Sequence, residues 1–174
     1  MNGRADGVPD PAETLALARR TLRESRAEWT TVEATAARAG NVRFARGAVT
    51  TSEHGEGTRV VMVAGFGARS ARVSVDGSDP ATLREATRRA EELARRAPED
   101  PEFVPPLGPQ TYGEGRAHAE STAEFQPTDL AGLVAPALDA ARGAGVTAAG
   151  LAEARVWTRA LVTSAGLEAC ERRT

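Results

Sequence analysis

The chain has 174 residues, of which 41% are hydrophobic and 26% charged, and its formal net charge is −2. This length and this balance fit one soluble globular domain with a core of its own. A charge so close to zero provides no overall field that would attract nucleic acid or an anionic membrane.

Cys170 is the only cysteine, which excludes an internal disulfide framework and fits a reducing compartment. The sequence has no apolar run of 18 residues, and residues 1–9 contain no apolar segment. A membrane span and a signal peptide are therefore not expected. The sequence favours a cytoplasmic protein.

The first quarter of the chain predicts a helix followed by strands. Residues 1–9 are polar and glycine-containing, so we expect a flexible N-terminus ahead of one domain over residues 10–174. Asp10 and Pro11 are typical of a helix start, and the apolar spacing extends that helix to about Arg26. Further segments are then expected in order: a strand over 28–38, a turn at 40–41, a short strand over 42–45 and a polar loop or strand end over 51–57.

The central stretch predicts two strands and a helix. Val60, Val61, Met62, Val63 and Ala64 form the most continuous apolar run, short enough for a buried strand. Residues 70–75 alternate between polar and apolar, as a half-buried strand does, and a turn at 76–77 closes them. An Asp-Pro pair at 79–80 then begins an amphipathic helix that runs to residue 97.

The remainder begins with a proline-rich connector over 98–127, which we expect to be irregular. A helix over 128–143, a long strand over 151–164 and a final strand ending at Thr174 follow. The predicted fold class is α+β, with a mainly antiparallel β-meander covered by amphipathic helices on one face.

No catalytic or metal-binding motif stands out. The two histidines, His54 and His118, lie too far apart in the sequence for the helical HExxH pair that binds zinc. His118-Ala119-Glu120 imitates half of a deaminase signature, but no P-C-x-x-C follows it. Cys170 is best interpreted as a small strand residue. The sequence leaves open a metal site assembled in space from His54, His118, Cys170 and carboxylates, but no spacing points to one.

Two further patterns have a structural explanation. Gly65-x-Gly67 leads into a strand rather than a helix, so we interpret it as a tight hairpin and not as a phosphate cradle. The arginines of the 80–97 helix alternate with glutamates at i,i+3 and i,i+4 spacing, which favours a salt-bridged surface over a nucleic-acid patch.

The order of several short motifs resembles the N-terminal region of the TldD/PmbA family, and most closely its PmbA (TldE) branch. The motifs span nearly the whole chain, and they are Val42-Arg43-Phe44 with Gly47, the stretch 57–63, Gly65-Phe66-Gly67-Ala68, Asp79-Pro80, the stretch 97–101, Ser164, Gly166, Leu167 and Arg172-Arg173-Thr174. Thr163 departs from the asparagine that the family often has before its Ser-x-Gly turn.

The resemblance implies a metalloprotease family that works as paired subunits, once called modulators of DNA gyrase. In that family the zinc motif HExxxH lies in the C-terminal half, and the PmbA-type partner lacks it. The resemblance therefore implies no catalytic, cofactor-binding or metal-binding residue in this chain. It places the zinc in a TldD-like catalytic partner or in a C-terminal domain.

Three functions follow from this as hypotheses. In the first, the chain is an N-terminal domain or split subunit that contributes assembly, as in a heterodimer, and handling of a peptide substrate. An extended peptide would add to a sheet edge supplied by residues 60–64 or by residues 28–37. The second is a stand-alone non-catalytic scaffold that pairs with a larger protease-like subunit. The third is a nucleic-acid-associated modulator, which the net charge argues against.

Overall fold

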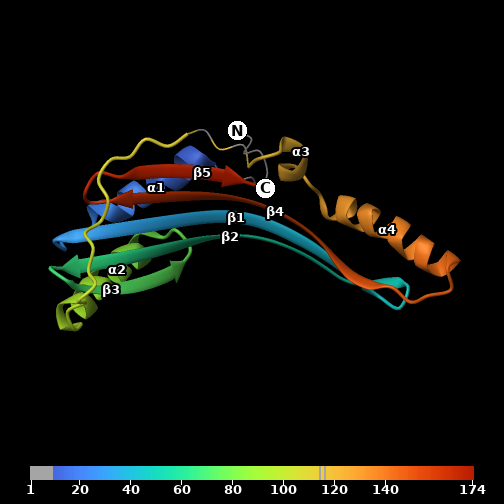
Figure 1. The fold of residues 1–174 in the computed structure, drawn as a ribbon, viewed down its shortest axis with the longest axis horizontal. Helices are drawn as coiled ribbons and strands as arrows, with labels where there is room; N and C mark the ends of the chain where they lie inside the picture. The colour runs from blue at the N-terminus through green and yellow to red at the C-terminus, as the bar shows by residue number, and fades with distance from the viewer. Residues whose placement is uncertain (1–9, 114, 116) are drawn as a thin grey trace.

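The computed structural model describes residues 10–113, 115 and 117–174, and Figure 1 shows a long, bent sheet with helices packed along it. The elements in chain order are α1 (Pro11–Arg23), β1 (Trp29–Ala45), β2 (Ala48–Phe66), β3 (Arg69–Asp76), α2 (Pro80–Arg96), α3 (Glu120–Ala123), α4 (Pro127–Gly143), β4 (Ala149–Thr163) and β5 (Glu168–Arg173). No helix in the described part of the chain is long and apolar enough to cross a membrane.

The strand order is β3-β2-β1-β4-β5, and every pair is antiparallel. The α+β class and the antiparallel sheet predicted from the sequence are confirmed. The central strand β1 pairs along its length with β2 on one side and with β4 on the other. The hairpins β1–β2 and β4–β5 therefore meet through a long-range pairing between the two ends of the chain.

The β1–β2 hairpin differs from the prediction. The turn lies at Arg46 and Gly47, whose φ angles of 53° and 78° suit a two-residue hairpin turn, and not at residues 40–41. Gly40 lies inside β1, paired with His54 and Ala154, and a Cβ at this position would lie only 2.7 Å from the Phe125 ring. Residues 51–57, for which the sequence predicts a polar loop or a strand end, lie within the strand β2, since they pair one by one with β1.

All three long helices cover one face of the sheet, which we call the helix-covered face. Side chains alternate along β1, so its even-numbered residues share this face. Val32 and Ala34 pack with α1 and α2 in one apolar cluster, whereas Val42 packs with Phe125 and α4 in a second. The odd-numbered residues of β1 lie on the opposite face, which we call the open face.

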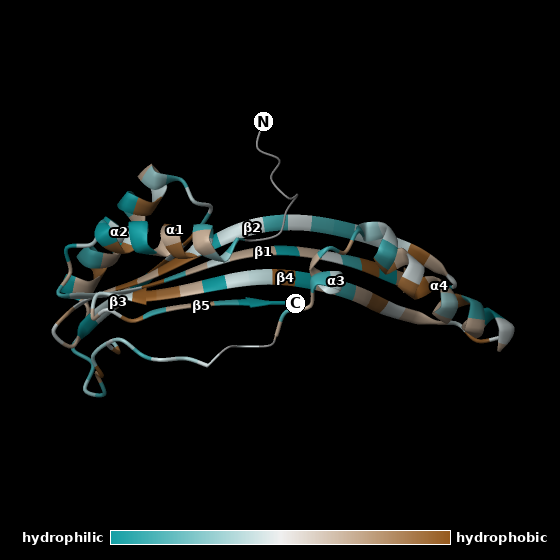
Figure 2. Cartoon of the chain, turned by 90° about the horizontal axis from the view of Figure 1, so that it is seen from above, coloured by the Kyte–Doolittle hydropathy of each residue, from teal (hydrophilic) through white to brown (hydrophobic). Residues whose placement is uncertain are grey.

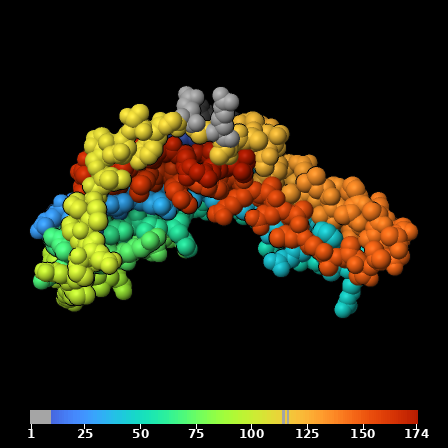
Figure 3. All heavy atoms as spheres, viewed as in Figure 1, coloured from blue at the N-terminus to red at the C-terminus, as the bar shows by residue number. Residues whose placement is uncertain are grey.

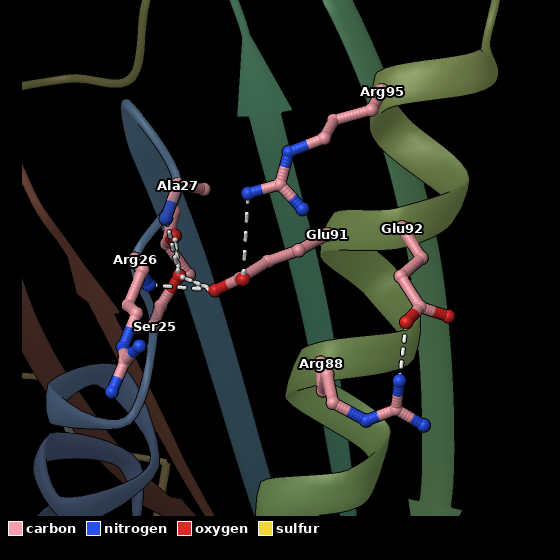
Figure 4. A network of polar contacts seen from close by, with 8 residues as sticks. Ser25, Arg26, Ala27, Arg88, Glu91, Glu92 and Arg95 are labelled. Carbon is pink, nitrogen blue, oxygen red and sulfur yellow. Dashed lines mark hydrogen bonds and ion pairs between the residues drawn. The ribbon is translucent and has the colours of Figure 1, made fainter.

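Helix α2 is fixed to the rest of the domain by one buried carboxylate. Glu91 is 7% exposed, and it accepts hydrogen bonds from the backbone N–H of Arg26 at 2.6 Å and from the Ser25 hydroxyl at 3.1 Å. Figure 4 shows that Glu91 points away from the solvated Arg88–Glu92 pair on the same helix. Because it satisfies a backbone donor of the α1–β1 loop, Glu91 joins the two helices that cover this end of the sheet.

The proline-rich connector crosses the open face near the end of the sheet and then runs beside β5 (Figures 1 and 3). Phe103 stacks on Trp29 with a centroid distance of 5.3 Å, and the Leu107 carbonyl accepts a hydrogen bond from the Thr163 hydroxyl at 2.9 Å. Further along, Thr174 N–H donates to the Ala117 carbonyl at 3.0 Å. The described residues of the connector are irregular as predicted, apart from the short helix α3.

Candidate peptide-binding edge

The predicted edge residues Val60, Val61, Met62, Val63 and Ala64 lie inside the sheet. Each of them pairs with β1 on one side and with β3 on the other. Val60 and Met62 are fully buried in the core under α1 and α2. The backbone of this segment has no free side, so the prediction that it supplies an edge is wrong. Residues 28–37 fail for the same reason, because β1 is the central strand.

The first part of β2 is where the sheet has a free border. Strand β3 pairs with β2 only from Arg59 to Phe66, and a last hydrogen bond runs from Gly77 N–H to the Thr58 carbonyl at 2.7 Å. Gly77 has a φ of 105°, and this conformation turns the chain away toward α2. Among the described residues, the segment Ala48–Gly57 therefore pairs with β1 alone, and Figure 2 shows β2 as the border strand there.

The ion pair between Arg59 and Asp76 marks the point where β3 leaves this border. The Arg59 guanidinium lies 2.8 Å from the Asp76 carboxylate, and this hydrogen bond, with the attraction of the charge, lowers the pKa of Asp76 from its ordinary value. A strand that paired with β2 at residues before Arg59 would occupy the same side of β2 as β3 does.

The other borders of the sheet are shorter or flanked. Strand β3 has eight residues. Strand β5 lies beside the connector, where Ala119 N–H donates to the Thr174 hydroxyl at 3.0 Å. Among the described residues the first part of β4 also pairs with β1 alone, but α3 packs against β4 in addition to α4, which contacts β2 as well. The segment Ala48–Gly57, which we call the free segment of β2, is therefore the best candidate for strand addition.

The direction of the free backbone groups follows from the Gly77–Thr58 hydrogen bond. In an antiparallel strand, successive residues direct their N–H and C=O groups to opposite sides. Because Thr58 directs its carbonyl toward β3, Ser52, His54 and Glu56 direct theirs to the same side, away from β1. These three residues offer donors and acceptors that an added strand could pair with.

Side chains of the free segment alternate between the two faces. His54 and Glu56 lie on the helix-covered face, where the His54 ring meets Phe125 edge-on at 6.0 Å. Glu53, Gly55 and Gly57 lie on the open face, and a Cβ added at either glycine would meet nothing within 4 Å. The glycines that suggested a loop in the sequence thus leave space beside an exposed strand.

Arg38 is the buried cation next to this segment, opposite Glu56 in the β1–β2 pairing. It is 4% exposed, its guanidinium lies 4.7 Å from the Phe125 ring centroid, and it donates a hydrogen bond to the Ala123 carbonyl. Sequence reasoning missed this residue, because nothing in the local pattern distinguishes it from an exposed strand arginine.

The histidines and the cysteine do not form a metal site within the described residues. His118 contacts Glu120 at 3.0 Å, whereas His54 lies against Phe125. The Cys170 thiol contacts the Pro11 carbonyl at 3.6 Å, and burial raises its pKa from the ordinary value. The part of the chain that the structure describes holds no group of three or more His, Cys, Asp and Glu side chains placed to share a metal ion.

Thr163, the departure from the family pattern, fits the β4–β5 turn. Its backbone N–H donates to the Leu167 carbonyl at 2.9 Å, and its hydroxyl accepts from the Leu167 N–H at 3.1 Å. The same hydroxyl holds the connector through Leu107. Thr163 therefore closes the β4–β5 turn through its backbone N–H and its hydroxyl, and the hydroxyl also binds the connector.

Comparison with solved structures identifies the fold. TldE from Thermococcus kodakarensis superposes with a TM-score of 0.81 at 17% identity, over 94% of this chain and 37% of that one. A proposed DNA gyrase modulator from Bacteroides thetaiotaomicron gives 0.75 at 10% identity, over 91% and 37% of the two chains. Another from Thermotoga maritima gives 0.71 at 11% identity, over 83% and 33%.

No family model and no curated protein matches the sequence. The chain spans about a third of the length of these structures, in their N-terminal part. The resemblance read from the sequence is thus confirmed at the level of the fold: this chain has the fold of the N-terminal part of the TldD/PmbA family.

Proposed function

We propose that this chain is an N-terminal domain or split subunit of a TldD/PmbA-type metalloprotease complex, in which it binds extended peptide and contributes to assembly. One observation carries the peptide-binding role: within the part of the chain that the structure describes, the free segment of β2 is paired on one side only, and it extends beyond the end of β3. An extended peptide added there would gain main-chain hydrogen bonds, as in other cases of β-augmentation.

The catalytic zinc belongs, in this proposal, to a TldD-like partner or to a C-terminal domain. The sequence contains neither HExxH nor HExxxH. A hydrolysis assay with added zinc tests this assignment. The chain alone should not turn over a peptide that the complex cleaves, and robust zinc-dependent turnover by the chain alone would contradict the proposal.

The peptide-binding role is tested by removing one outward backbone donor. Because the His54 N–H points away from β1, His54→Pro should block strand addition while it keeps the ladder to β1 intact. His54→Ala is the matched control, since it removes the same imidazole but keeps the N–H. Binding of a labelled extended peptide, followed by fluorescence anisotropy, should be lost in the proline variant and retained in the alanine variant.

A second readout uses the peptide itself. N-methylation of the peptide amides that face Ser52, His54 and Glu56 should abolish binding, whereas N-methylation of the intervening amides should not. Equal binding of both methylated peptides would show that the peptide does not join the sheet as a strand.

The outward face of α4 supports the assembly role. Where α1 and α2 expose arginine and glutamate, α4 exposes small and apolar residues along its middle: Ala131, Gly132, Leu133, Ala135, Pro136, Ala137 and Ala140. Leu133 is 70% exposed, and Figure 2 shows the contrast in hydropathy between α2 and α4. Since the matched structures continue for about two thirds of their length beyond this fold, a further TldD/TldE part can cover this face, and we propose a TldD-like partner chain as its occupant.

Paired variants test this assignment. Leu133→Glu on α4 should weaken co-elution with a full-length TldD-like protein in size-exclusion chromatography, whereas Leu93→Glu on the charged helix α2 should not. The stand-alone scaffold is the second candidate, and the same α4 face favours it. It predicts that Leu133→Glu breaks the pairing while His54→Pro leaves every measured activity unchanged.

A further inference from the structure

We propose that the free segment of β2 selects extended peptides that carry basic side chains at two positions three residues apart, facing Glu53 and Glu56. The inference rests on the proposed strand addition and specifies the peptides that the edge accepts.

The charges of the free segment have a single sign. Between Gly47 and Thr58 the only charged residues are Glu53 and Glu56, and both are exposed. Glu53 accepts a hydrogen bond from the neutral Asn41 amide at 3.2 Å. In the described part of the chain neither carboxylate forms an ion pair, so both are available to an incoming cation.

The nearest arginines on the neighbouring strand do not neutralise these carboxylates. Arg38 lies opposite Glu56, but its guanidinium is directed to the Ala123 carbonyl and the Phe125 ring. Arg43 lies opposite Thr51, diagonally from Glu53, and no ion pair joins it to Glu53 among the described residues. Both arginines stand one strand further from an added peptide than the two glutamates do.

The spacing of the two basic positions follows from the strand geometry. Residues directly opposite each other in an antiparallel pair have Cβ atoms about 4.5–5.5 Å apart, within reach of an ion pair. Glu53 lies on the open face and Glu56 on the helix-covered face. A peptide residue facing Glu56 and the residue three positions later, facing Glu53, therefore project to opposite faces and each meet one carboxylate.

The residues of β2 between and next to Glu53 and Glu56 place little restriction on the size of a peptide side chain. Gly55 and Gly57 leave open space on the open face, next to Ala39 and Ala37 of β1. A peptide side chain of any size can lie over these small residues. Charge, rather than a side-chain pocket, therefore sets the selectivity of this edge.

Three labelled peptides of equal length test the inference. The first carries arginine at the positions that face Glu56 and Glu53, the second carries two arginines only two positions apart, so that both project to one face, and the third carries glutamate at the two positions of the first. We expect the first to bind the wild-type chain most tightly and the third most weakly. The difference should shrink at roughly 1 M salt, where the screening length is about 3 Å.

Variants of the chain test whether Glu53 and Glu56 are the source of the preference for the arginine peptide. Glu53→Gln and Glu56→Gln should each weaken the first peptide about two- to fivefold, the range for exposed ion pairs, and the double variant should remove the difference between the peptides. Glu102→Gln removes the same charge from the connector and should change nothing.

The outcomes separate the two proposals. Equal binding of the arginine and glutamate peptides, with loss of both in His54→Pro, would overturn the charge selectivity and keep strand addition. No binding of any peptide, with no effect of His54→Pro, would overturn the proposed peptide binding itself.

Discussion

The Glu91 carboxylate on α2 lies 2.6 Å from the backbone nitrogen of Arg26, in the loop between α1 and β1. A backbone donor and a buried charged acceptor thereby satisfy each other across two elements that are far apart in the sequence. Glu91→Ala leaves the Arg26 N–H without a partner. We expect a loss of about 1.5–3 kcal/mol in the free energy of unfolding, measured by urea denaturation.

Glu92→Ala is the matched control for that experiment. Glu92 lies one position further along α2 and forms only an exposed pair with Arg88, so its removal should cost less than about 0.5 kcal/mol. An equal loss in both variants would show that the hydrogen bond to Arg26 contributes no more to stability than an exposed ion pair does.

Gly65 faces Trp29 so closely that no side chain fits between them. A Cβ at position 65 would lie 2.0 Å from the Trp29 ring. Gly65→Ala should therefore displace Trp29, break its 2.9 Å hydrogen bond to the Gly67 carbonyl and separate it from Phe103. We expect a loss of about 1–3 kcal/mol and a shift of Trp29 fluorescence, read in a Trp157→Phe background.

Gly57→Ala provides the comparison, because a Cβ at position 57 meets nothing within 4 Å. Unchanged fluorescence in Gly65→Ala would mean that the ring has another position available without cost.

Arg38 should hold α3 on the sheet. Arg38→Met keeps most of the apolar stem but removes the donor to the Ala123 carbonyl and the charge over Phe125. We expect a loss of about 1–2 kcal/mol, measured by urea denaturation with far-UV circular dichroism. Arg43→Met, at an exposed position of the same strand, should stay within about 0.5 kcal/mol of the parent. Equal effects would refute the anchoring role.

The stability of the fold should fall in acid. Hydrogen bonds from Arg59 and Arg19 lower the pKa values of Asp76 and Glu168, and the Thr82 backbone N–H lowers the pKa of Asp79. A lowered pKa in the folded state means that the unfolded chain binds protons first. The stabilisation is thus present above the unfolded values, about 3.9 for Asp and 4.3 for Glu, and is lost as the pH falls through the folded ones.

Thermal melting between neutral pH and pH 2 measures this effect. The melting temperature should decline below about pH 4, and less steeply in Glu168→Gln than in the parent. A melting temperature that rises on acidification would contradict the assignment.

The local elements could be predicted from sequence because their signals are local. Asp10 and Asp79 each cap a helix that begins with proline, and the side chains accept from Ala12 and Thr82 N–H as the pattern implies. The alternation of polar and apolar residues over 70–75 likewise predicts a strand, and β3 spans these residues. The resemblance to the TldD/PmbA family gave the fold, which the solved structures confirm.

The site could not be predicted because a strand's edges are a property of the whole sheet. The apolar run at Val60–Ala64 correctly indicates burial, and burial here means a partner on each side. The polar, glycine-containing residues 51–57 resembled a loop, yet a partner strand that begins more than ten positions earlier makes them a strand. Only the pairing order shows which of the two segments has a free side.

The two apolar clusters share no residue, and this division has a consequence for cooperativity. The cluster around Phe125 is the smaller, and the free segment of β2 belongs to its half of the sheet. Native-state hydrogen exchange should therefore reveal a separate unfolding unit there, which opens at a lower free energy than the half under α1 and α2. A peptide bound along β2 would slow exchange in that unit first.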